Sequence, residues 1–269
     1  MSKYILHNFD LLREEDFSLK INNRSFLYSD GFFESIKVIN SICFNLECHF
    51  DRIEKTSKFF KMDIDFSCSE LKKILESLII KNAIIGGNLR VVFYRESKGK
   101  YFPEENKISF VAEIEKLDNG FLFNENGLKL GVFKEMRKDK SKFSNYKTTN
   151  AAIYVLASIY AKENIWDDCL LLNSENNIIE SSNSNLFLVK ENIIFTPPLE
   201  DGCVDGTMRN YLQSQFNVVE KSITKKDLFV ASEVFLTNSI KGVKWIERFE
   251  EKKYQSHKIA RLVFNKLNF

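Results

Sequence analysis

Two apolar patterns alternate along this chain, and together they limit the folds open to it. Runs of strand length, at 32–40, 88–96 and 107–115, stand beside longer segments with apolar residues at helical spacing, at 47–62 and 67–85. No segment repeats at a fixed period, and the chain contains neither a Gly-x-Gly-x-x-Gly nor a Walker lysine motif. The mixture predicts an α+β protein without a Rossmann pattern.

The predicted elements form two clusters, separated by the stretch KLDNGFLFNEN at 116–126. We therefore predict a small N-terminal α+β domain over 1–117 and a larger C-terminal domain over 118–269. The elements expected in the second cluster are a strand at 128–133, a helix over 148–165, a meander of short strands over 169–198, a helix from 205, a short helix leading into a strand over 225–239, and an amphipathic helix over 255–269.

Helix ends and faces are also predicted from local chemistry. Ser67 or Ser69 is expected to cap the 67–85 helix, and two glycines at 86–87 are expected to end it. Asp205 is the expected cap of the helix that follows it. The side of the 148–165 helix expected to be buried consists of Ala151, Ala152, Val155, Ile159 and Tyr160.

Charge and composition exclude several classes of protein. The 39 basic and 37 acidic residues give a net charge of +2, which lacks the basic excess of a nucleic-acid-binding protein. No apolar run reaches the roughly 18–20 residues that span a membrane, and the N-terminus resembles no targeting peptide, so we expect a cytoplasmic protein. Five cysteines without a C-x-x-C pair and three dispersed histidines predict neither a metal site nor a disulfide framework.

Four motifs carry the functional prediction. They are RSFLYSDGFFESI at 24–36, HFDR at 49–52, Lys147 followed by DDCLLLNSENNIIESSNSNLF at 167–187, and DGTMR at 205–209 with EVFLTNS at 233–239. Together they resemble the class IV, or fold-type IV, pyridoxal-phosphate enzymes, a family of branched-chain and D-amino-acid aminotransferases and aminodeoxychorismate lyase. The resemblance implies a small α/β sandwich domain plus a larger pseudo-barrel domain, the cofactor pyridoxal 5'-phosphate, and a homodimer.

A pyridoxal-phosphate site needs an amine for the cofactor's aldehyde, an anion for its protonated ring nitrogen and a cradle for its phosphate. The resemblance assigns the amine to Lys147, which also carries protons once substrate has displaced it. On local sequence alone, Lys147 would be an exposed loop lysine, because lysines are rarely buried. The resemblance assigns the anion to Glu180, for which the alternative is a surface glutamate beside a hairpin.

The phosphate is expected at a helix N-terminus, on the backbone amides of Thr207 and Met208 and the Thr207 hydroxyl. The resemblance adds Arg52 as a phosphate arginine and Ser239 as a hydroxyl ligand. Further cofactor-binding candidates are Asn238, beside Ser239, and Asn185, which the pattern favours as a turn former.

Two arginines near these motifs have other interpretations. Arg52 is alternatively a helix-surface residue paired with Glu47 or Asp51, or lines the cleft without touching phosphate. Arg209 follows the family pattern and is interpreted as structural.

The substrate side is predicted from arginine chemistry. Arg90 is the candidate for the substrate carboxylate, because a guanidinium binds a carboxylate through two hydrogen bonds. Arg95 and Lys100 are expected behind it, with a solvated strand end as their alternative. Tyr28 and Glu34 lie at the family's aromatic and acidic positions.

The chain departs from its relatives at several positions. Ser29 replaces the usual glycine, and Ala152 stands where the branched-chain enzymes carry tyrosine. The Arg-x-His pair of the D-amino-acid enzymes is absent, whereas Asn150 resembles those enzymes and the lyase.

Two functions follow from the resemblance. The first is an aminotransferase that moves an amino group between an amino acid and a 2-oxo acid. The second is aminodeoxychorismate lyase, which releases pyruvate and leaves 4-aminobenzoate for folate synthesis. A fold retained only for binding is disfavoured, because Lys147, Glu180 and Arg52 are all present.

Overall fold

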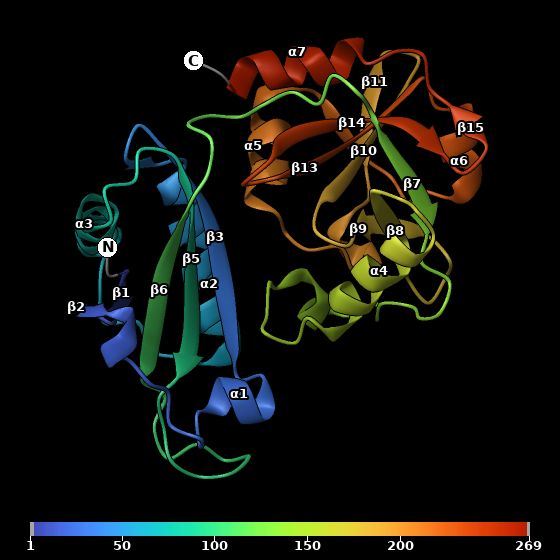
Figure 1. The fold of residues 1–269 in the computed structure, drawn as a ribbon. Helices are drawn as coiled ribbons and strands as arrows, with labels where there is room; N and C mark the ends of the chain where they lie inside the picture. The colour runs from blue at the N-terminus through green and yellow to red at the C-terminus, as the bar shows by residue number, and fades with distance from the viewer. Residues whose placement is uncertain (1–2, 268–269) are drawn as a thin grey trace. The chain divides into compact units, whose positions relative to one another are not determined.

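The computed structural model describes residues 3–267, which form two compact units (Figure 1). The N-terminal unit contains the chain up to Gly120 together with Lys147–Asn150. The C-terminal unit contains Phe121–Tyr146 and the chain from Ala151 onward. The short segment Lys147–Asn150 therefore belongs to a different unit from the residues on either side of it. The domain boundary after residue 117 stays a prediction.

The N-terminal unit is built on a six-stranded sheet in the order β2-β1-β6-β5-β3-β4. Its strands are β1 (Tyr4–His7), β2 (Asp10–Arg13), β3 (Gly31–Ile39), β4 (Ile42–Cys43), β5 (Gly87–Arg95) and β6 (Ile108–Lys116). Its helices are α1 (Arg24–Tyr28), α2 (Leu46–Phe60) and α3 (Cys68–Lys81), with the 3-10 turn η1 (Glu14–Asp16). The predicted helices at 47–62 and 67–85 and strands at 88–96 and 107–115 are confirmed within a few residues.

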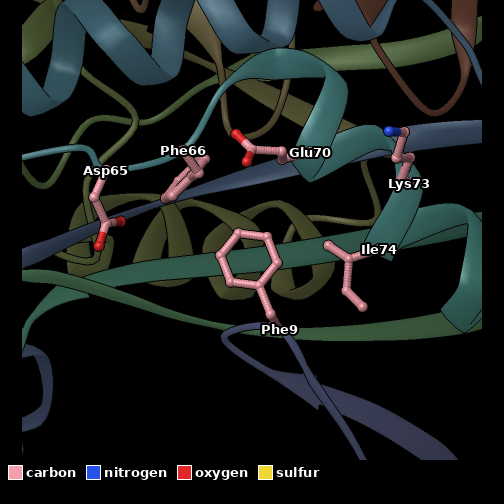
Figure 2. Close-up of a pocket in the computed structure, with 6 residues that line it drawn as sticks. All are labelled: Phe9, Asp65, Phe66, Glu70, Lys73 and Ile74. Carbon is pink, nitrogen blue, oxygen red and sulfur yellow. The ribbon is translucent and has the colours of Figure 1, made fainter.

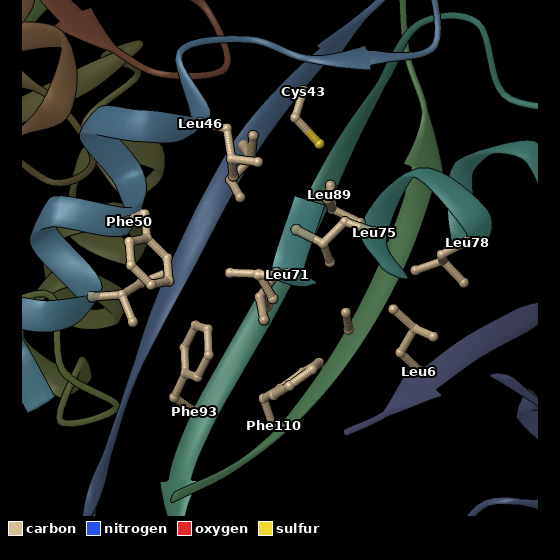
Figure 3. Packing of buried hydrophobic residues seen from close by; sticks show 14 of the residues in the cluster. Leu6, Cys43, Leu46, Phe50, Leu71, Leu75, Leu78, Leu89, Phe93 and Phe110 are labelled. Carbon is tan, nitrogen blue, oxygen red and sulfur yellow. The ribbon is translucent and has the colours of Figure 1, made fainter. Parts of the chain in front are cut away.

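The core of this unit lies between one face of the sheet and helices α2 and α3 (Figure 3). Alternate residues of β5, including Leu89 and Phe93, are buried there, because successive strand side chains point to opposite faces. Arg90 is exposed on the other face. The sheet therefore presents its second face, with Arg90, away from the apolar core.

The predicted cap of α3 is confirmed, but its predicted end is wrong. Ser67 accepts a hydrogen bond from the Glu70 amide, and the Glu70 carboxylate accepts one from the Ser67 amide. The helix ends at Lys81, ahead of the two glycines, because Ala83 adopts a left-handed backbone conformation with φ at +53° and the Ile84 amide donates back to the Ile79 carbonyl oxygen at 3.2 Å. The left-handed residue that ends the helix is thus an alanine, and the Asn82 side chain adds a bond to the Leu78 carbonyl oxygen at 2.9 Å.

The C-terminal unit is built on a nine-stranded sheet. Its strands are β7 (Leu128–Val132), β8 (Asp168–Leu172), β9 (Ile178–Ser181), β10 (Asn185–Lys190), β11 (Ile193–Thr196), β12 (Val218–Glu220), β13 (Glu233–Asn238), β14 (Gly242–Phe249) and β15 (Lys252–Lys253). Its helices are α4 (Ala152–Glu163), α5 (Thr207–Gln215), α6 (Lys225–Val230) and α7 (Lys258–Leu267), with the 3-10 turns η2 (Lys142–Asn145) and η3 (Leu199–Asp201).

Part of this sheet closes on itself. Strands β10, β13, β14, β7, β8 and β9 pair in that order, and β9 pairs back with β10 where Glu180 faces Asn185. Closure removes the unpaired edges from these strands. This closed path is the expected pseudo-barrel, and two predicted cofactor-binding residues form its closing pair.

The predicted buried side of the helix over 148–165 is wrong at Ala152, Val155 and Ile159, which are exposed, whereas Tyr160 packs against the core as predicted. The structure buries Ala157 and Ala161, while Val155 and Ile159 are 57% and 49% exposed. Apolar residues surround nearly the whole of α4, so their spacing does not select a face. The small Ala157 allows a close approach, and its carbonyl oxygen accepts from the Cys169 thiol of β8. The helix also starts later than predicted, at Ala152.

Within residues 3–267, no helix is both long enough and apolar enough to cross a membrane.

Candidate functional site

Lys147 lies on a short extended segment that pairs with the start of β3. The Phe33 amide donates to the Lys147 carbonyl oxygen at 3.0 Å, and the Thr149 amide donates to the Gly31 carbonyl oxygen at 3.0 Å. Gly31 allows the start of β3 to lie close to β5 and α1, because a Cβ there would lie 2.6 Å from the Phe93 carbonyl oxygen and 2.7 Å from Ser25 Oγ. The main chain of Lys147 is therefore held by the sheet, and its side chain is half-buried.

One aromatic ring brings Lys147 and Arg90 together. The Lys147 Nζ atom lies 4.1 Å from the centre of the Phe33 ring, and the Arg90 Cζ atom lies 4.4 Å from it. Cations are attracted to the face of an aromatic ring at such distances. The predicted catalytic amine and the predicted carboxylate-binding guanidinium thus share a platform on the N-terminal unit.

A buried ion pair links β3 to α2 beside this platform. Arg52 Nε and Nη2 donate to the two Glu34 oxygens at 2.8 and 2.5 Å, and His49 Nδ1 donates to Glu34 Oε2 at 2.6 Å. Burial alone would raise the pKa of Glu34, but Arg52 and His49 together lower it to about 2. Burial lowers the pKa of His49, and Lys147 acts in the same direction. Glu34 is therefore ionised and His49 neutral near pH 7.

This ion pair bears on two sequence predictions. Arg52 pairs with Glu34, a partner that the sequence did not suggest. Glu34, predicted on the substrate side, is 1% exposed and bound to α2. The sequence spacing between a strand glutamate and a helix arginine does not predict that they pair, because only the tertiary fold makes them neighbours.

The other predicted substrate residues are scattered over the same unit. Arg95 is buried, and donates to the side chains of Asp30 and Asn106 and to two carbonyl oxygens of α2 and its C-cap. Lys100 is exposed in the β5–β6 loop, and its carbonyl oxygen accepts from Arg24. The Tyr28 ring lies 5.5 Å from that of Tyr101. Arg90 therefore lies at the Phe33 ring together with Lys147, whereas Arg95 and Lys100 make their recorded contacts elsewhere in the unit.

In the C-terminal unit, Glu180 lies buried on β9 among three donors. Lys138 Nζ and the Tyr154 hydroxyl donate to Glu180 Oε1 at 2.6 and 2.9 Å. The Val204 amide donates to Oε2 at 2.9 Å. Neither Lys138 nor Tyr154 was among the predicted site residues. Lys138 is one cation in the basic run RKDK, and only the fold reveals which of these side chains turns inward.

Helix α5 begins without a side-chain cap among residues 3–267. Gly206 is the N-cap, and no side chain of the described residues caps the helix there, so Asp205 is not the cap that was predicted. A Cβ on Gly206 would lie 1.9 Å from Asn185 Oδ1, which explains the glycine. The Thr207 and Ser239 hydroxyls lie 2.9 Å apart. Amides of a first helical turn attract anions.

Two asparagines shape the surroundings of α5. Asn185 donates to the Val204 carbonyl oxygen at 2.9 Å, which holds the chain before the helix. The Asn238 side chain accepts from the amides of Ile240 and Lys241, which forms the turn after β13. Arg209 is 2% exposed and pairs with Glu220 at 2.6 Å, as expected of a structural residue.

A separate surface pocket of about 380 Å³ lies in the N-terminal unit (Figure 2). It is lined by Phe9, Asp65, Phe66, Glu70, Lys73 and Ile74. None of these is a predicted site residue. Among residues 3–267, no group of three or more His, Cys, Asp or Glu side chains is arranged to hold a metal ion.

Comparison with known proteins decides the family. The model of the family described as amino-transferase class IV matches residues 31–248, which is most of the chain. The chain belongs to this family. The class IV relatives include D-alanine aminotransferase of Bacillus licheniformis, 25% identical over 87% of this chain and 84% of the relative. They also include aminodeoxychorismate lyase of Vibrio harveyi, 29% identical over 83% and 84%.

Solved structures confirm the predicted fold. A branched-chain aminotransferase from Thermoproteus uzoniensis is 23% identical, with a TM-score of 0.91 over 99% of this chain and 94% of the relative. A putative 4-amino-4-deoxychorismate lyase from Legionella pneumophila is 26% identical, with a TM-score of 0.83 over 93% and 94%. This class IV protein thus has the two-domain fold-type IV architecture, and it is an enzyme of an aminotransferase and lyase family.

Class IV enzymes depend on pyridoxal phosphate, and the residues described here fit that cofactor. A carboxylate accepts about four hydrogen bonds, and the described residues supply three to Glu180, which leaves one acceptor direction on Oε2. That direction suits a protonated ring nitrogen. The α5 N-terminus, with the Thr207 and Ser239 hydroxyls, has the donors that a phosphate requires.

Proposed function

We propose that this class IV enzyme is a pyridoxal-phosphate-dependent aminotransferase that moves an amino group between an amino acid and a 2-oxo acid. The observation that carries the proposal is the Phe33 platform, where an amine and a guanidinium approach the same ring. An α-amino acid or 2-oxo acid presents its reacting nitrogen or carbonyl next to a carboxylate. An amine beside a carboxylate-binding arginine matches that pair of groups.

When bound, pyridoxal phosphate supplies an electron sink for bonds at the carbon that bears the amino group. Lys147 Nζ would hold the cofactor, and as a free amine it would move the proton at that carbon. The pairing of its main chain with β3 positions the base of this side chain. Glu180 would accept from the protonated ring nitrogen through Oε2.

The phosphate is assigned to the first turn of α5. The amides of Thr207 and Met208 and the hydroxyls of Thr207 and Ser239 donate to it, while Asn185 and Asn238 shape the surrounding turns. The role of Arg52 at the phosphate rests on the family resemblance, since its Nε and Nη2 atoms are committed to Glu34. Arg90 orients the substrate carboxylate. Tyr28 and Lys100 are assigned to the outer substrate side, and Arg95 and Glu34 support the fold around it.

A second candidate is aminodeoxychorismate lyase. The Vibrio harveyi lyase is 29% identical, against 25% for the D-alanine aminotransferase of Bacillus licheniformis. Asn150 and Ala152 also depart from the branched-chain pattern. The same amine, carboxylate and phosphate site would serve both reactions, so the two candidates differ in substrate and not in the groups described here.

Arg90→Lys separates the two candidates, because lysine lacks the planar fork of arginine. For an aminotransferase, the variant should raise KM for amino donor and oxo acid by similar factors, since both use one carboxylate site. For the lyase, the variant should impair pyruvate release from aminodeoxychorismate, and transamination should already be a minor activity of the wild-type protein. The measurement is a pair of titrations of wild type and variant with an amino donor and with aminodeoxychorismate. Equal behaviour of the two proteins towards both would remove Arg90 from the site.

The proposal includes a cytoplasmic homodimer, as the family resemblance implies. One observation supports an association surface. Apolar side chains of α1 and the β5–β6 loop are exposed: Phe26 at 73%, Tyr101 at 88% and Phe102 at 84%. Figure 1 shows α1 and this loop at the same end of the N-terminal sheet. We call Phe26, Leu27, Tyr28, Tyr101 and Phe102 the α1 patch. Exposed apolar clusters of this kind mark association surfaces.

A further inference from the structure

Lys138 is a buried lysine in the C-terminal unit, paired with the carboxylate predicted to face the cofactor ring. Its Nζ atom donates to Glu180 Oε1 at 2.6 Å and to the Ser144 carbonyl oxygen at 2.9 Å. Lysines are almost never buried unless they are paired, and Lys138 is 7% exposed. Its neighbours in the RKDK run behave differently. Lys140 binds Glu175 at the surface, and Arg137 is exposed.

The sheet brings Lys138 to Glu180 through its register. The Lys138 amide donates to the Leu172 carbonyl oxygen, so the chain after β7 runs beside the end of β8. Glu180 of β9 is paired with Leu171 of the same strand. Lys138 and Glu180 are thus held from two sides of one short stretch of β8, and their main chains cannot drift apart without breaking the sheet.

The other contacts of Glu180 make its orientation specific. The Tyr154 hydroxyl shares Oε1 with Lys138, and the Lys138 ammonium lies 5.3 Å from the Tyr154 ring centre. Burial and the neighbouring Glu180 raise the pKa of Tyr154 well above its ordinary value of 10, so this hydroxyl stays a donor. Lys138 and Tyr154 saturate Oε1, and the Val204 amide occupies one side of Oε2. One direction on Oε2 is left to accept a further donor.

We propose that Lys138 is a positioning residue that supplies the cation for the buried Glu180 carboxylate and aims its free Oε2 acceptor direction at the cofactor ring nitrogen. This inference rests on the proposed function, because it assigns Glu180 that role. The physical reason is the cost of burying a carboxylate without a cation. Without Lys138, the Glu180 carboxylate would be buried without a cation, and the orientation of its Oε2 atom towards the ring nitrogen would lose one of its three donors.

The test compares Lys138→Met with Lys140→Met, a matched change in the same basic run. Single-turnover rates with an amino donor are measured from pH 6 to pH 10 with saturating pyridoxal phosphate. Lys138→Met should lose about 10- to 100-fold near pH 7 and move the acidic limb of the pH profile upward by about one unit or more. Lys140→Met should follow wild type. A Lys138→Met profile that coincides with that of Lys140→Met overturns the proposal.

A double-mutant cycle with Glu180→Gln separates positioning from simple structural support. If Lys138 acts through Glu180, then adding Lys138→Met to Glu180→Gln should change the rate by less than about twofold. A full additional loss in that background would mean that Lys138 acts elsewhere, and would overturn the proposal. The double variant also carries no buried charge at this pair. If Lys138→Met alone fails to fold, the double variant is the protein to measure, because no charge is left buried at this pair. Lys138→Gln serves as a second uncharged replacement of Lys138.

The cofactor-free protein supplies an independent readout. Lys138→Met should lower the midpoint of thermal unfolding more at pH 8 than at pH 5, because the unpaired Glu180 can be protonated at the lower pH. An equal loss at both pH values would overturn the proposal. Failure of wild type to bind pyridoxal phosphate would sink the proposed function instead, and this unfolding comparison would still decide whether Lys138 neutralises Glu180.

Discussion

At the residue scale, the proposed chemistry depends on a lysine whose main chain pairs with a sheet strand. Lys147 is surrounded by polar residues in sequence, yet its carbonyl oxygen accepts from the Phe33 amide and its ammonium lies over the Phe33 ring. The sheet thus fixes the main chain of this lysine, and the Phe33 ring attracts its ammonium. Other lysines of the same stretch, such as Lys142, are exposed.

Lys147→Ala should abolish covalent trapping of pyridoxal phosphate by borohydride, because the bonding amine is removed. Lys142→Ala, an exposed lysine five residues earlier, is the control and should trap normally. The measurement is peptide mapping of the reduced protein by mass spectrometry. Label on another lysine in the wild-type protein would show that the assignment is mistaken.

Residue 29 illustrates how a departure from the family pattern acts locally. Ser29 ends α1 with φ at +54°, in the left-handed region that glycine adopts most easily. The usual glycine of the motif therefore has a backbone reason. Serine tolerates the position at a cost of about 1–2 kcal/mol in local conformation.

At the scale of elements, β3 and α2 are joined by the buried trio Glu34, His49 and Arg52. Removing one partner of a buried ion pair leaves the other charge without compensation. The same strand carries Phe33, which precedes Glu34 and contacts Lys147 with its ring, and Lys147 also lowers the pKa of His49. Variants of this trio therefore affect folding and cofactor binding together, and experiments have to separate the two effects.

Arg52→Ala should destabilise the protein by about 3–5 kcal/mol, because Glu34 is left buried without its cation. If Arg52 also binds phosphate, cofactor affinity should fall by roughly 10- to 150-fold. Glu34→Gln combined with Arg52→Ala removes both charges and should recover much of the stability while affinity stays low. Denaturant unfolding and equilibrium dialysis measure the two quantities. If the double variant recovers cofactor affinity as well as stability, then Arg52 contributes to folding and does not bind phosphate.

The same trio predicts a dependence of stability on pH. The pKa of His49 is lowered in the folded protein, so its contribution is complete above its ordinary value of 6.5 and declines as the pH falls below it. The pKa of Glu34 is about 2 against an ordinary 4.5, so its contribution is lost only as the pH falls from 4.5 towards 2. Between pH 7 and 5, thermal midpoints of wild type should therefore fall more than those of His49→Gln. Parallel curves for the two proteins would contradict the burial of a neutral His49.

At the scale of the whole molecule, an exposed apolar surface favours association. The α1 patch combines residues from two segments of the N-terminal unit, and its Tyr101 and Phe102 side chains are among the most exposed large apolar groups described. Leaving such groups in water is unfavourable, at about 25 cal/mol for each Å² of apolar area that a partner would cover. A second copy of the chain is the partner that the family resemblance implies.

Replacing both Tyr101 and Phe102 with Asp should shift the protein from dimer towards monomer. Ile165→Asp is the matched control, because Ile165 is 89% exposed but lies in the C-terminal unit, outside the patch. Sedimentation equilibrium over a range of concentrations gives the dissociation constant of each protein. A monomeric wild type, or a double variant as dimeric as Ile165→Asp, would rule out the patch as the dimer surface.

The sequence alone determined the family, the α+β class and most element positions. Strand and helix periods depend on local side-chain spacing, and the motif order from 24–36 to 233–239 is a property of the chain itself. The cap of α3 was also predictable, because Ser67 and Glu70 are neighbours in sequence. These features need no knowledge of long-range contacts.

Only the tertiary structure decided which side chains meet. Glu34 with Arg52, Lys147 with Arg90 over Phe33, and Lys138 with Glu180 are pairs from separate elements, brought together by strand pairing or by the packing of a helix on a sheet. The buried face of α4 was likewise undecided, since an apolar stripe that surrounds a helix has no preferred side until a strand packs against it. Burial and pairing are properties of the folded chain, because each depends on residues that are distant in sequence.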